Sequence, residues 1–302
     1  MTGQSLCWPA LRHVFAQGRF SLGGARIEPA SSGSQPVAVQ TRLRRGAGAV
    51  QRFDVAGALW TLVRTDFKVR YHGTVMGFVW AMLKPLAMFL VLMSVFTFVF
   101  SNQPDYAIHL VLGLFLYDYF QESTKGGLIS LHAKGYLIGR SRFPRWLLVV
   151  ASTANPLLVI TTGSAAIVAC LAFTGRAPGV QALALYGLYI ALFAGIVIGF
   201  SLATSVLFVR YRDLNQVWDV IAQAGLFVAP IIYPIGILPE RFHRLVYLWP
   251  PTPVIEFSRS VLISGAVPTG RAHALLVAAA AASLAVGILV YRRLAPTTPE
   301  HL

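Results

Sequence analysis

Residues 146–173 read WLLVVASTANPLLVITTGSAAIVACLAF, and residues 181–209 read QALALYGLYIALFAGIVIGFSLATSVLFV. Neither stretch contains an aspartate, glutamate, lysine or arginine, and each exceeds the ~20 apolar residues that a helix needs to cross a bilayer. The whole chain of 302 residues is 56% hydrophobic and 12% charged, whereas soluble domains carry about 25% charged residues. The sequence therefore predicts an integral membrane protein and excludes a soluble cytosolic enzyme.

Together with these two stretches, the sequence predicts six membrane-spanning helices. They are predicted over 76–100, 106–122, 146–173, 181–209, 217–233 and 273–291. The second span is the weakest because Asp118 and Glu122 mark its end, and the fifth is short and interrupted by Pro230. The expected fold is an all-α membrane protein whose transmembrane domain covers 76–293.

A basic amphipathic helix is predicted before the first span, over 50–72. Its apolar residues recur at spacings of three and four, which places them on one helical face. These positions are Phe53, Ala56, Trp60, Val63, Phe67 and Tyr71. The segment is too polar to cross a bilayer, and basic helices with aromatic anchors usually lie in the membrane interface. We therefore expect an interfacial helix, with an ordinary soluble amphipathic helix as the alternative.

Residues 237–265 are predicted to form a re-entrant or interfacial helical hairpin on the outer side, between the fifth and sixth spans. Prolines in and around this segment prevent one continuous helix. They are Pro234, Pro239, Pro250, Pro251, Pro253 and Pro268. Two short helices, over 239–248 and 253–264, fit this pattern. Irregular backbone of this kind is tolerated in a membrane protein at the interface or where protein buries it.

Both ends of the chain are predicted to be cytoplasmic. Of the 25 lysines and arginines, 19 fall in segments that this orientation places inside, and basic residues favour the cytoplasmic side. Residues 1–49 have no spanning apolar run, and we expect a disordered cytoplasmic extension, with an organellar transit peptide as the alternative. Residues 294–302 form the expected cytoplasmic tail. The net charge of +14 thus mainly indicates which segments face the cytoplasm, and no nucleic-acid partner is expected.

The sequence contains no motif for nucleotide binding or catalysis. None of the four lysines follows a glycine, so the Gly-Lys-Ser/Thr of a P-loop is absent. No acidic residue occurs from 123 to 212, which disfavours a proton relay inside the membrane. HExxH and GxSxG are absent, and Cys7 and Cys170 stand in no ligand motif. We expect no catalytic residue, no metal and no cofactor in this chain.

Aromatic residues crowd the first two predicted spans. Four of them are candidates for lining a transport pathway, where their faces could stack against sugar rings: Phe89, Phe96, Tyr117 and Phe120. The alternative is that these side chains face lipid or form an interfacial belt. Periodicity alone does not separate the two.

Three ordered blocks of the sequence resemble ABC-2 type permeases that export polysaccharides. The blocks carry Arg70, Tyr71, Trp80 and Pro85, then Arg212, Asp213, Tyr233 and Pro234, then Pro250, Glu256 and Arg259. The resemblance covers residues 52–293 and is nearest to the O-antigen and teichoic acid branch. The sequence departs from the family at Trp249, where an asparagine is common before the proline.

The resemblance implies a homodimer of this chain that works with two copies of a separate ABC ATPase, which binds ATP and Mg²⁺. The substrate would be a polysaccharide on an undecaprenyl pyrophosphate carrier, moved from the cytoplasmic to the outer side of the bacterial inner membrane. Two alternatives stay open. One is an ABC-2 exporter of a drug or small lipid, and the other is a membrane-bound glycosyl- or acyltransferase.

The resemblance also suggests roles for particular residues. Coupling to the ATPase would involve Lys134, Tyr136, Arg140, Arg142 and Phe143, with Arg212 and Asp213 at a second contact. The substrate entrance, where cations would pair with the pyrophosphate, would involve Arg64, Lys68, Arg70 and Tyr71. Anchoring to anionic membrane lipids is the alternative for these four. Pro250, Glu256 and Arg259 belong to the outer hairpin.

Overall fold

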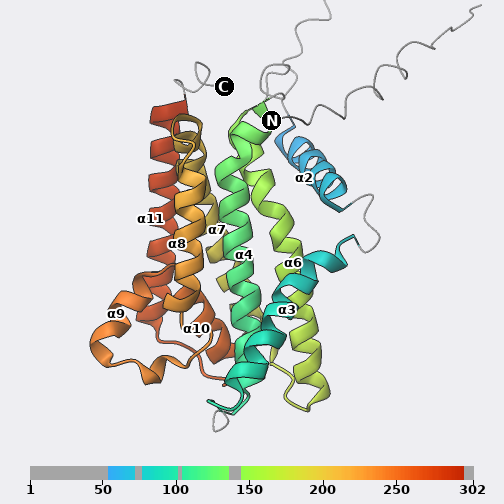
Figure 1. The fold of residues 1–302 in the computed structure, drawn as a ribbon, viewed down its shortest axis with the longest axis vertical. Helices are drawn as coiled ribbons and strands as arrows, with labels where there is room; N and C mark the ends of the chain where they lie inside the picture. The colour runs from blue at the N-terminus through green and yellow to red at the C-terminus, as the bar shows by residue number, and fades with distance from the viewer. Residues whose placement is uncertain (1–53, 72–76, 101–103, 136–143, 296–302) are drawn as a thin grey trace, which may run out of the picture. The chain divides into compact units, whose positions relative to one another are not determined.

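The computed structural model describes residues 54–71, 77–100, 104–135 and 144–295, and these residues form helices and connecting turns with no strand. The predicted extension 1–49 lies outside the described residues, as does the predicted tail beyond residue 295. In chain order the helices are α2 (Val55–Tyr71), α3 (Val79–Phe96), α4 (Tyr106–Ala133), α6 (Trp146–Phe173), α7 (Val180–Arg210), α8 (Leu214–Val228), α9 (Glu240–Leu248), α10 (Pro251–Leu262) and α11 (Gly270–Leu294), with a short 3₁₀ turn, η1 (Ile235–Ile237). Figure 1 shows the long helices running side by side.

Four of these helices, α3, α6, α7 and α11, are long and apolar enough to cross a membrane. They correspond to four of the six predicted spans. The other two predicted spans fall on α4 and α8, which do not meet both conditions of length and composition. The described residues therefore establish a helical membrane protein with four candidate spans.

The second span is predicted to end at Glu122, but the helix does not end there, since α4 continues to Ala133. Asp118 and Glu122 do not end this helix because they lie in its middle and pair with Lys84 of α3. Paired charges can remain inside a helical bundle, where isolated charges would be costly.

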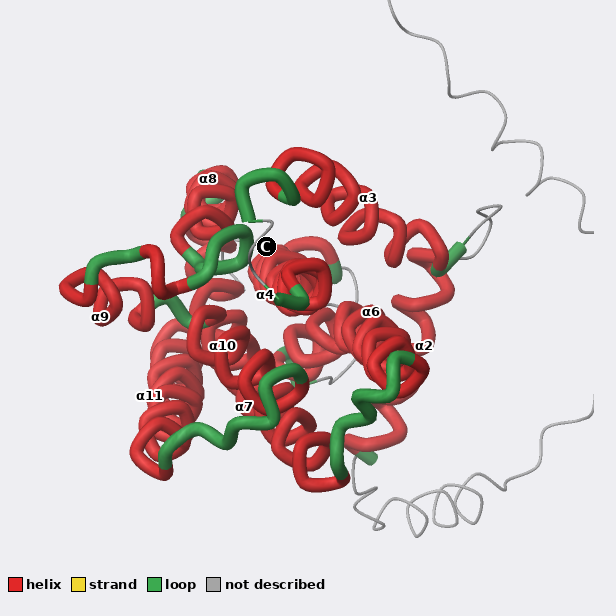
Figure 2. Tube along the Cα trace, turned by 90° about the horizontal axis from the view of Figure 1, so that it is seen from below, coloured by secondary structure: helices red, strands yellow, loops and turns green. Residues whose placement is uncertain are grey.

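Helix α4 lies at the centre of the bundle. It packs against α3, α6, α7, α8 and α10, and Figure 2 shows it inside a ring of these helices. Leu110, Leu112 and Leu116 on α4 are fully buried. The ring of Phe120 stacks on that of Phe193 of α7, with centroids 5.8 Å apart. The core of the protein is thus built around one central helix.

Helices α7 and α11 are packed with their backbones close together. A Cβ atom added at Gly199 would lie 2.4 Å from the backbone of Ser283, and one added at Gly287 would lie 2.0 Å from the carbonyl oxygen of Gly199. Small residues permit such approach between helices in membranes, where van der Waals packing drives helix association.

The proline-rich segment after α8 contains two short helices, as predicted. Pro239 precedes α9, and Pro250 precedes α10, which begins with Pro251. Proline suits these positions because the N–H groups of the first helical residues have no intrahelical acceptor, so the N–H that proline lacks is not missed. Figure 1 shows α9 and α10 at one end of the bundle and α2 near the other.

We predict that Gly199→Ala destabilises the protein by about 1–3 kcal/mol, the usual cost of overpacking a core. The added methyl group would force α7 and α11 apart. Thermal unfolding of the purified protein in detergent measures this as a lowered Tm. Gly187→Ala on the same helix is the matched control, because a Cβ there meets no atom within 4 Å. Equal Tm values for the two variants would contradict the close packing.

Candidate functional site

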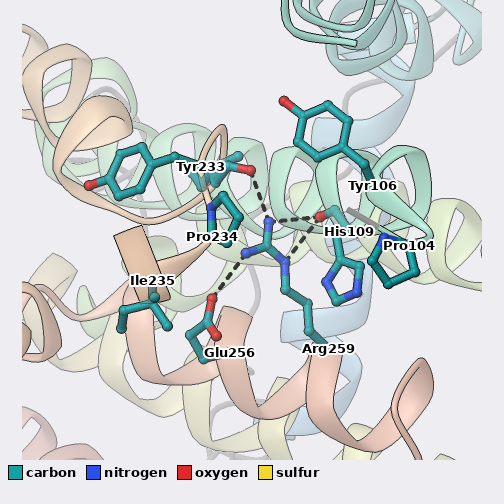
Figure 3. A pocket seen from close by; sticks show the side chains of 10 residues that line it. Pro104, Tyr106, His109, Tyr233, Pro234, Ile235, Glu256 and Arg259 are labelled. Atoms are coloured by element: carbon teal, nitrogen blue, oxygen red, sulfur yellow. Dashed lines mark hydrogen bonds and ion pairs between the residues drawn. The ribbon is translucent and has the colours of Figure 1, made fainter. Parts of the chain in front are cut away.

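A buried arginine on α10 holds together three segments that are distant in sequence. Arg259 is 5% exposed. Its Nε and Nη2 donate to the carbonyl oxygen of His109 on α4, at 3.0 and 2.7 Å. Its Nη1 donates to the carbonyl of Pro230 at 2.5 Å and to the Glu256 carboxylate at 3.0 Å, and Nη2 donates to the carbonyl of Ile231 at 3.0 Å. We call these contacts the Arg259 clamp, and Figure 3 shows those with His109 and Glu256.

The clamp is needed because the backbone leaves its helical path after α8. The chain is extended at Ala229, so the carbonyls of Pro230 and Ile231 have no partner in a helix ladder. Buried carbonyl groups without a donor are costly, above all within a membrane. Gly113 makes room for the guanidinium, since a Cβ at this position would lie 2.7 Å from Nη2.

All five N–H groups of Arg259 are used within the chain. A cavity of about 140 Å³ lies beside the clamp, between Tyr106, His109, Tyr233 and Glu256. Burial lowers the pKa of Arg259 from its usual value, and the negative charge of Glu256 opposes this. Because no donor of Arg259 is left for a ligand, the clamp is a structural device that fixes α10 to α4 and to the chain after α8, rather than a binding site.

A second group of charges joins α2, α3 and α4. Lys84 Nζ lies 3.0 Å from Asp118 Oδ1 and 2.6 Å from Glu122 Oε1. Arg70 of α2 lies 3.6 Å from the other oxygen of Glu122. We call these four residues the Lys84 cluster. Nothing in the local spacing of the sequence identifies this cluster, because Lys84 and Glu122 are 38 positions apart.

A cavity of about 400 Å³ extends from the Lys84 cluster between α3, α4 and α8. Its walls are mostly apolar, from Met88, Val91, Leu114 and Leu226, and Lys84 and Asp118 lie at its edge. The cavity combines apolar walls with a few polar groups, which is the usual composition of a small-molecule binding site.

The candidate pathway aromatics occupy different positions. Phe89 and Phe96 of α3 are partly buried against the core. Tyr117 is 1% exposed and donates to the carbonyl of Ala222 on α8, yet its side chain lines the cavity between α3, α4 and α8. Phe120 is 2% exposed and lies between Phe193 and Trp218 within the core. Of the four, Tyr117 is the one that the structure places at a cavity.

The candidate coupling residues are described only in part. Lys134, next to the end of α4, pairs with Asp66 of α2 and donates to Ser152 of α6 at 2.9 Å. Arg212 and Asp213 are exposed in the turn between α7 and α8. Tyr136, Arg140, Arg142 and Phe143 lie outside the described residues.

The candidate entrance residues divide into two groups. Arg64 and Lys68 are exposed, one turn apart on α2. Arg70 belongs to the Lys84 cluster. The ring of Tyr71 packs on those of Phe67 and Phe78, with centroids 4.8 and 5.5 Å away, at the junction between α2 and α3.

Two further interhelical contacts were not foreseen from the sequence. Lys125 of α4 lies 2.8 Å from Asp219 of α8, and the indole of Trp218 donates to Thr124 at 3.0 Å. Lys125 follows the predicted end of the second span at Glu122, so the sequence offers no reason to expect it inside a helix. These contacts could be found only by knowing that α4 continues beyond its acidic residues to Ala133.

Helices of membrane-crossing length packed around a charged central helix define a multi-pass membrane protein. The chain belongs to the ABC-2 type transporter family, whose sequence model matches residues 57–263. This range includes both the Lys84 cluster and the Arg259 clamp.

Three relatives illustrate the similarity. The O-antigen export system permease protein RfbA of Klebsiella pneumoniae is 26% identical over 210 residues, which is 68% of this chain and 80% of that protein. A protein of the same name from Myxococcus xanthus is 25% identical over 201 residues, or 65% and 75% of the two chains. The polysialic acid transport protein KpsM of Escherichia coli is 21% identical over 258 residues, or 83% and 96%.

We predict that Arg259→Ala destabilises the protein by about 3–5 kcal/mol, the range found when one partner of a buried ion pair is removed. The carbonyls of Pro230 and Ile231 would lose their donor, and Glu256 would lose its counter-charge. Arg259→Lys should also lower the Tm in detergent, because an ammonium group has three donors rather than five.

Arg244→Ala is the matched control, since Arg244 is an exposed arginine on the neighbouring helix α9. Its Tm should remain close to that of the unmodified protein. If Arg259→Ala and Arg244→Ala unfold at the same temperature, the clamp does not stabilise the hairpin.

Proposed function

We propose that this chain is the membrane subunit of an ATP-driven exporter that moves a lipid-linked polysaccharide across the bacterial inner membrane. The observation that carries the proposal is the family match together with relatives named for O-antigen export and polysialic acid transport. The sequence has no P-loop, so ATP and Mg²⁺ would bind a separate nucleotide-binding subunit. An undecaprenyl pyrophosphate carrier would suit the basic face of α2.

The proposed orientation has both chain ends in the cytoplasm and α9 and α10 on the outer side. Helices α4, α7 and α11 all finish at the end of the bundle near α2 (Figure 1). Basic residues gather at these helix ends, among them Lys134, Arg210, Arg292 and Arg293. This arrangement supports the orientation because basic residues favour the cytoplasmic side.

In this orientation α4 and α8 would complete a set of six spans. The 28 residues of α4 extend about 42 Å at 1.5 Å per residue, which exceeds a bilayer core of ~30 Å. The 15 residues of α8 extend only about 22 Å. The irregular chain after α8, held by the Arg259 clamp, would cover the remaining depth, and α9 and α10 would form the re-entrant hairpin.

The proposed assembly is a homodimer of this chain with two ATPase subunits. The turn at Arg212 and Asp213 supports an ATPase contact, because it is exposed at the end of the bundle assigned to the cytoplasm. The exposed pair Arg64 and Lys68 on α2 supports a substrate entrance, since two cations one turn apart can pair with a pyrophosphate.

Deleting the gene should remove long-chain polysaccharide from the cell surface and leave lipid-linked polysaccharide inside the cell. The polymer would still be made but would have no route out. Surface extraction followed by gel electrophoresis, together with analysis of the lipid-linked pool, measures both effects. Complementation with the full chain should restore export. A normal surface polysaccharide in the deletion strain, without accumulation inside, would refute the proposal.

Arg212→Glu should lower export several-fold, because it reverses the charge at the proposed ATPase contact. Co-purification of the ATPase and its stimulation by the permease measure the coupling. Arg271→Glu, the same change at an exposed arginine at the start of α11, should leave both unchanged. Equal coupling in the two variants would argue against the turn between α7 and α8 as a contact.

A further inference from the structure

A cavity of about 330 Å³ lies between α2, α4 and α6. It is far larger than the ~10–15 Å³ that a single water needs on the same measure. Its polar lining includes Asp66 and Arg70 from α2, Lys134 beyond α4, and Ser152 and Asn155 from α6. We call it the α2 cavity. It is separate from the cavity between α3, α4 and α8.

Asn155 is the least satisfied polar side chain of the α2 cavity. It is 4% exposed, and its Oδ1 is buried without a hydrogen-bond donor. Buried polar groups almost always have a partner, and leaving one without costs about 1–3 kcal/mol. The terminal torsion of an asparagine is soft, so its amide can turn its oxygen towards the cavity.

A second acceptor lies beside Asn155. Pro156 is inside α6, and proline has no N–H to donate to the carbonyl four residues earlier, which belongs to Ser152. A Cβ at Gly126, another residue of the cavity lining, would lie 3.3 Å from this carbonyl oxygen. The α6 side of the cavity thus presents two acceptors, which call for a ligand with N–H donors.

The lining of the cavity also carries two cations. Arg70 is partly exposed, and its pairing with Glu122 is long at 3.6 Å. Lys134 pairs with Asp66 and Ser152 and has a third N–H. These two groups suit a phosphate, because charge-assisted hydrogen bonds to phosphate are strong.

The cavity opens beside an exposed apolar surface. Val69 of α2 lines it and is 79% exposed. Ile129 of α4 also contributes to the wall. A head group in the cavity could therefore continue into an acyl chain along α2, which fits a ligand that arrives from the membrane.

We propose that the α2 cavity binds the head group of an aminophospholipid such as phosphatidylethanolamine. Its ammonium group would donate to the side chain of Asn155 and the carbonyl of Ser152, and its phosphate would pair with Arg70 and Lys134. The lipid fastens α2 to α4 and α6. This inference does not depend on which substrate the protein exports.

The test measures thermal unfolding of the purified full-length chain in detergent. Each sample receives one added lipid, and the phospholipids compared have identical acyl chains. Phosphatidylethanolamine should raise the Tm by several degrees more than phosphatidylcholine, whose methylated ammonium has no N–H donor. Phosphatidylglycerol, which has the phosphate but no ammonium, and undecaprenyl phosphate should also give smaller shifts. Equal shifts for phosphatidylethanolamine and phosphatidylcholine would overturn the proposal.

Asn155→Leu should abolish the difference between phosphatidylethanolamine and phosphatidylcholine, and Asn155→Ala serves if the larger side chain prevents folding. Asn215→Leu is the matched control, because Asn215 also has a buried Oδ1 without a partner but does not line this cavity. It should keep the difference. A difference that survives both changes at Asn155, or that is lost equally in Asn215→Leu, would refute the assignment.

Discussion

The structure depends on a charged helix at the centre of an apolar bundle. Asp118 and Glu122 of α4 pair with Lys84 of α3, and Lys125 pairs with Asp219 of α8. An unpaired charge among apolar helices would be costly, so each pairing fixes the position of a neighbouring helix. The ring of helices around α4 is thus located by ion pairs as well as by apolar packing.

The segments at the two ends of the bundle are held in place by different contacts. At the end with α9 and α10, the chain leaves its helical path, and Arg259 supplies donors to carbonyls that have no helical partner. At the other end, α2 has no buried residue and is held by the packing of Phe67 and Tyr71 on Phe78 and by polar contacts, including that between Asp66 and Lys134. The first end is thus fastened by a buried arginine, whereas α2 is attached through side chains that are at least partly exposed.

This asymmetry suits the function that we propose. A permease driven by a separate ATPase must transmit a movement from one face of the membrane while keeping its outer segments intact. Helix α2 is joined to α3 and α4 through Arg70, Glu122 and Lys84, so a displacement at this end would reach two neighbouring helices directly. A lipid in the α2 cavity would set how firmly that end is held.

The amino-acid sequence predicts the membrane class, the positions of α6, α7 and α11, the short helices of the proline-rich segment and the resemblance to the ABC-2 family. These depend on local composition, because a run of apolar residues or a proline acts on its own neighbourhood. Three other features emerge only when the helices pack: α4 continues through its acidic residues, Arg259 donates to backbone carbonyls, and Asn155 borders a cavity. Each of these depends on a partner from a distant segment, such as Lys84 for Glu122 or the carbonyl of His109 for Arg259. Pairing across such separations leaves no periodic signal in one sequence, since it arises only when the helices pack together.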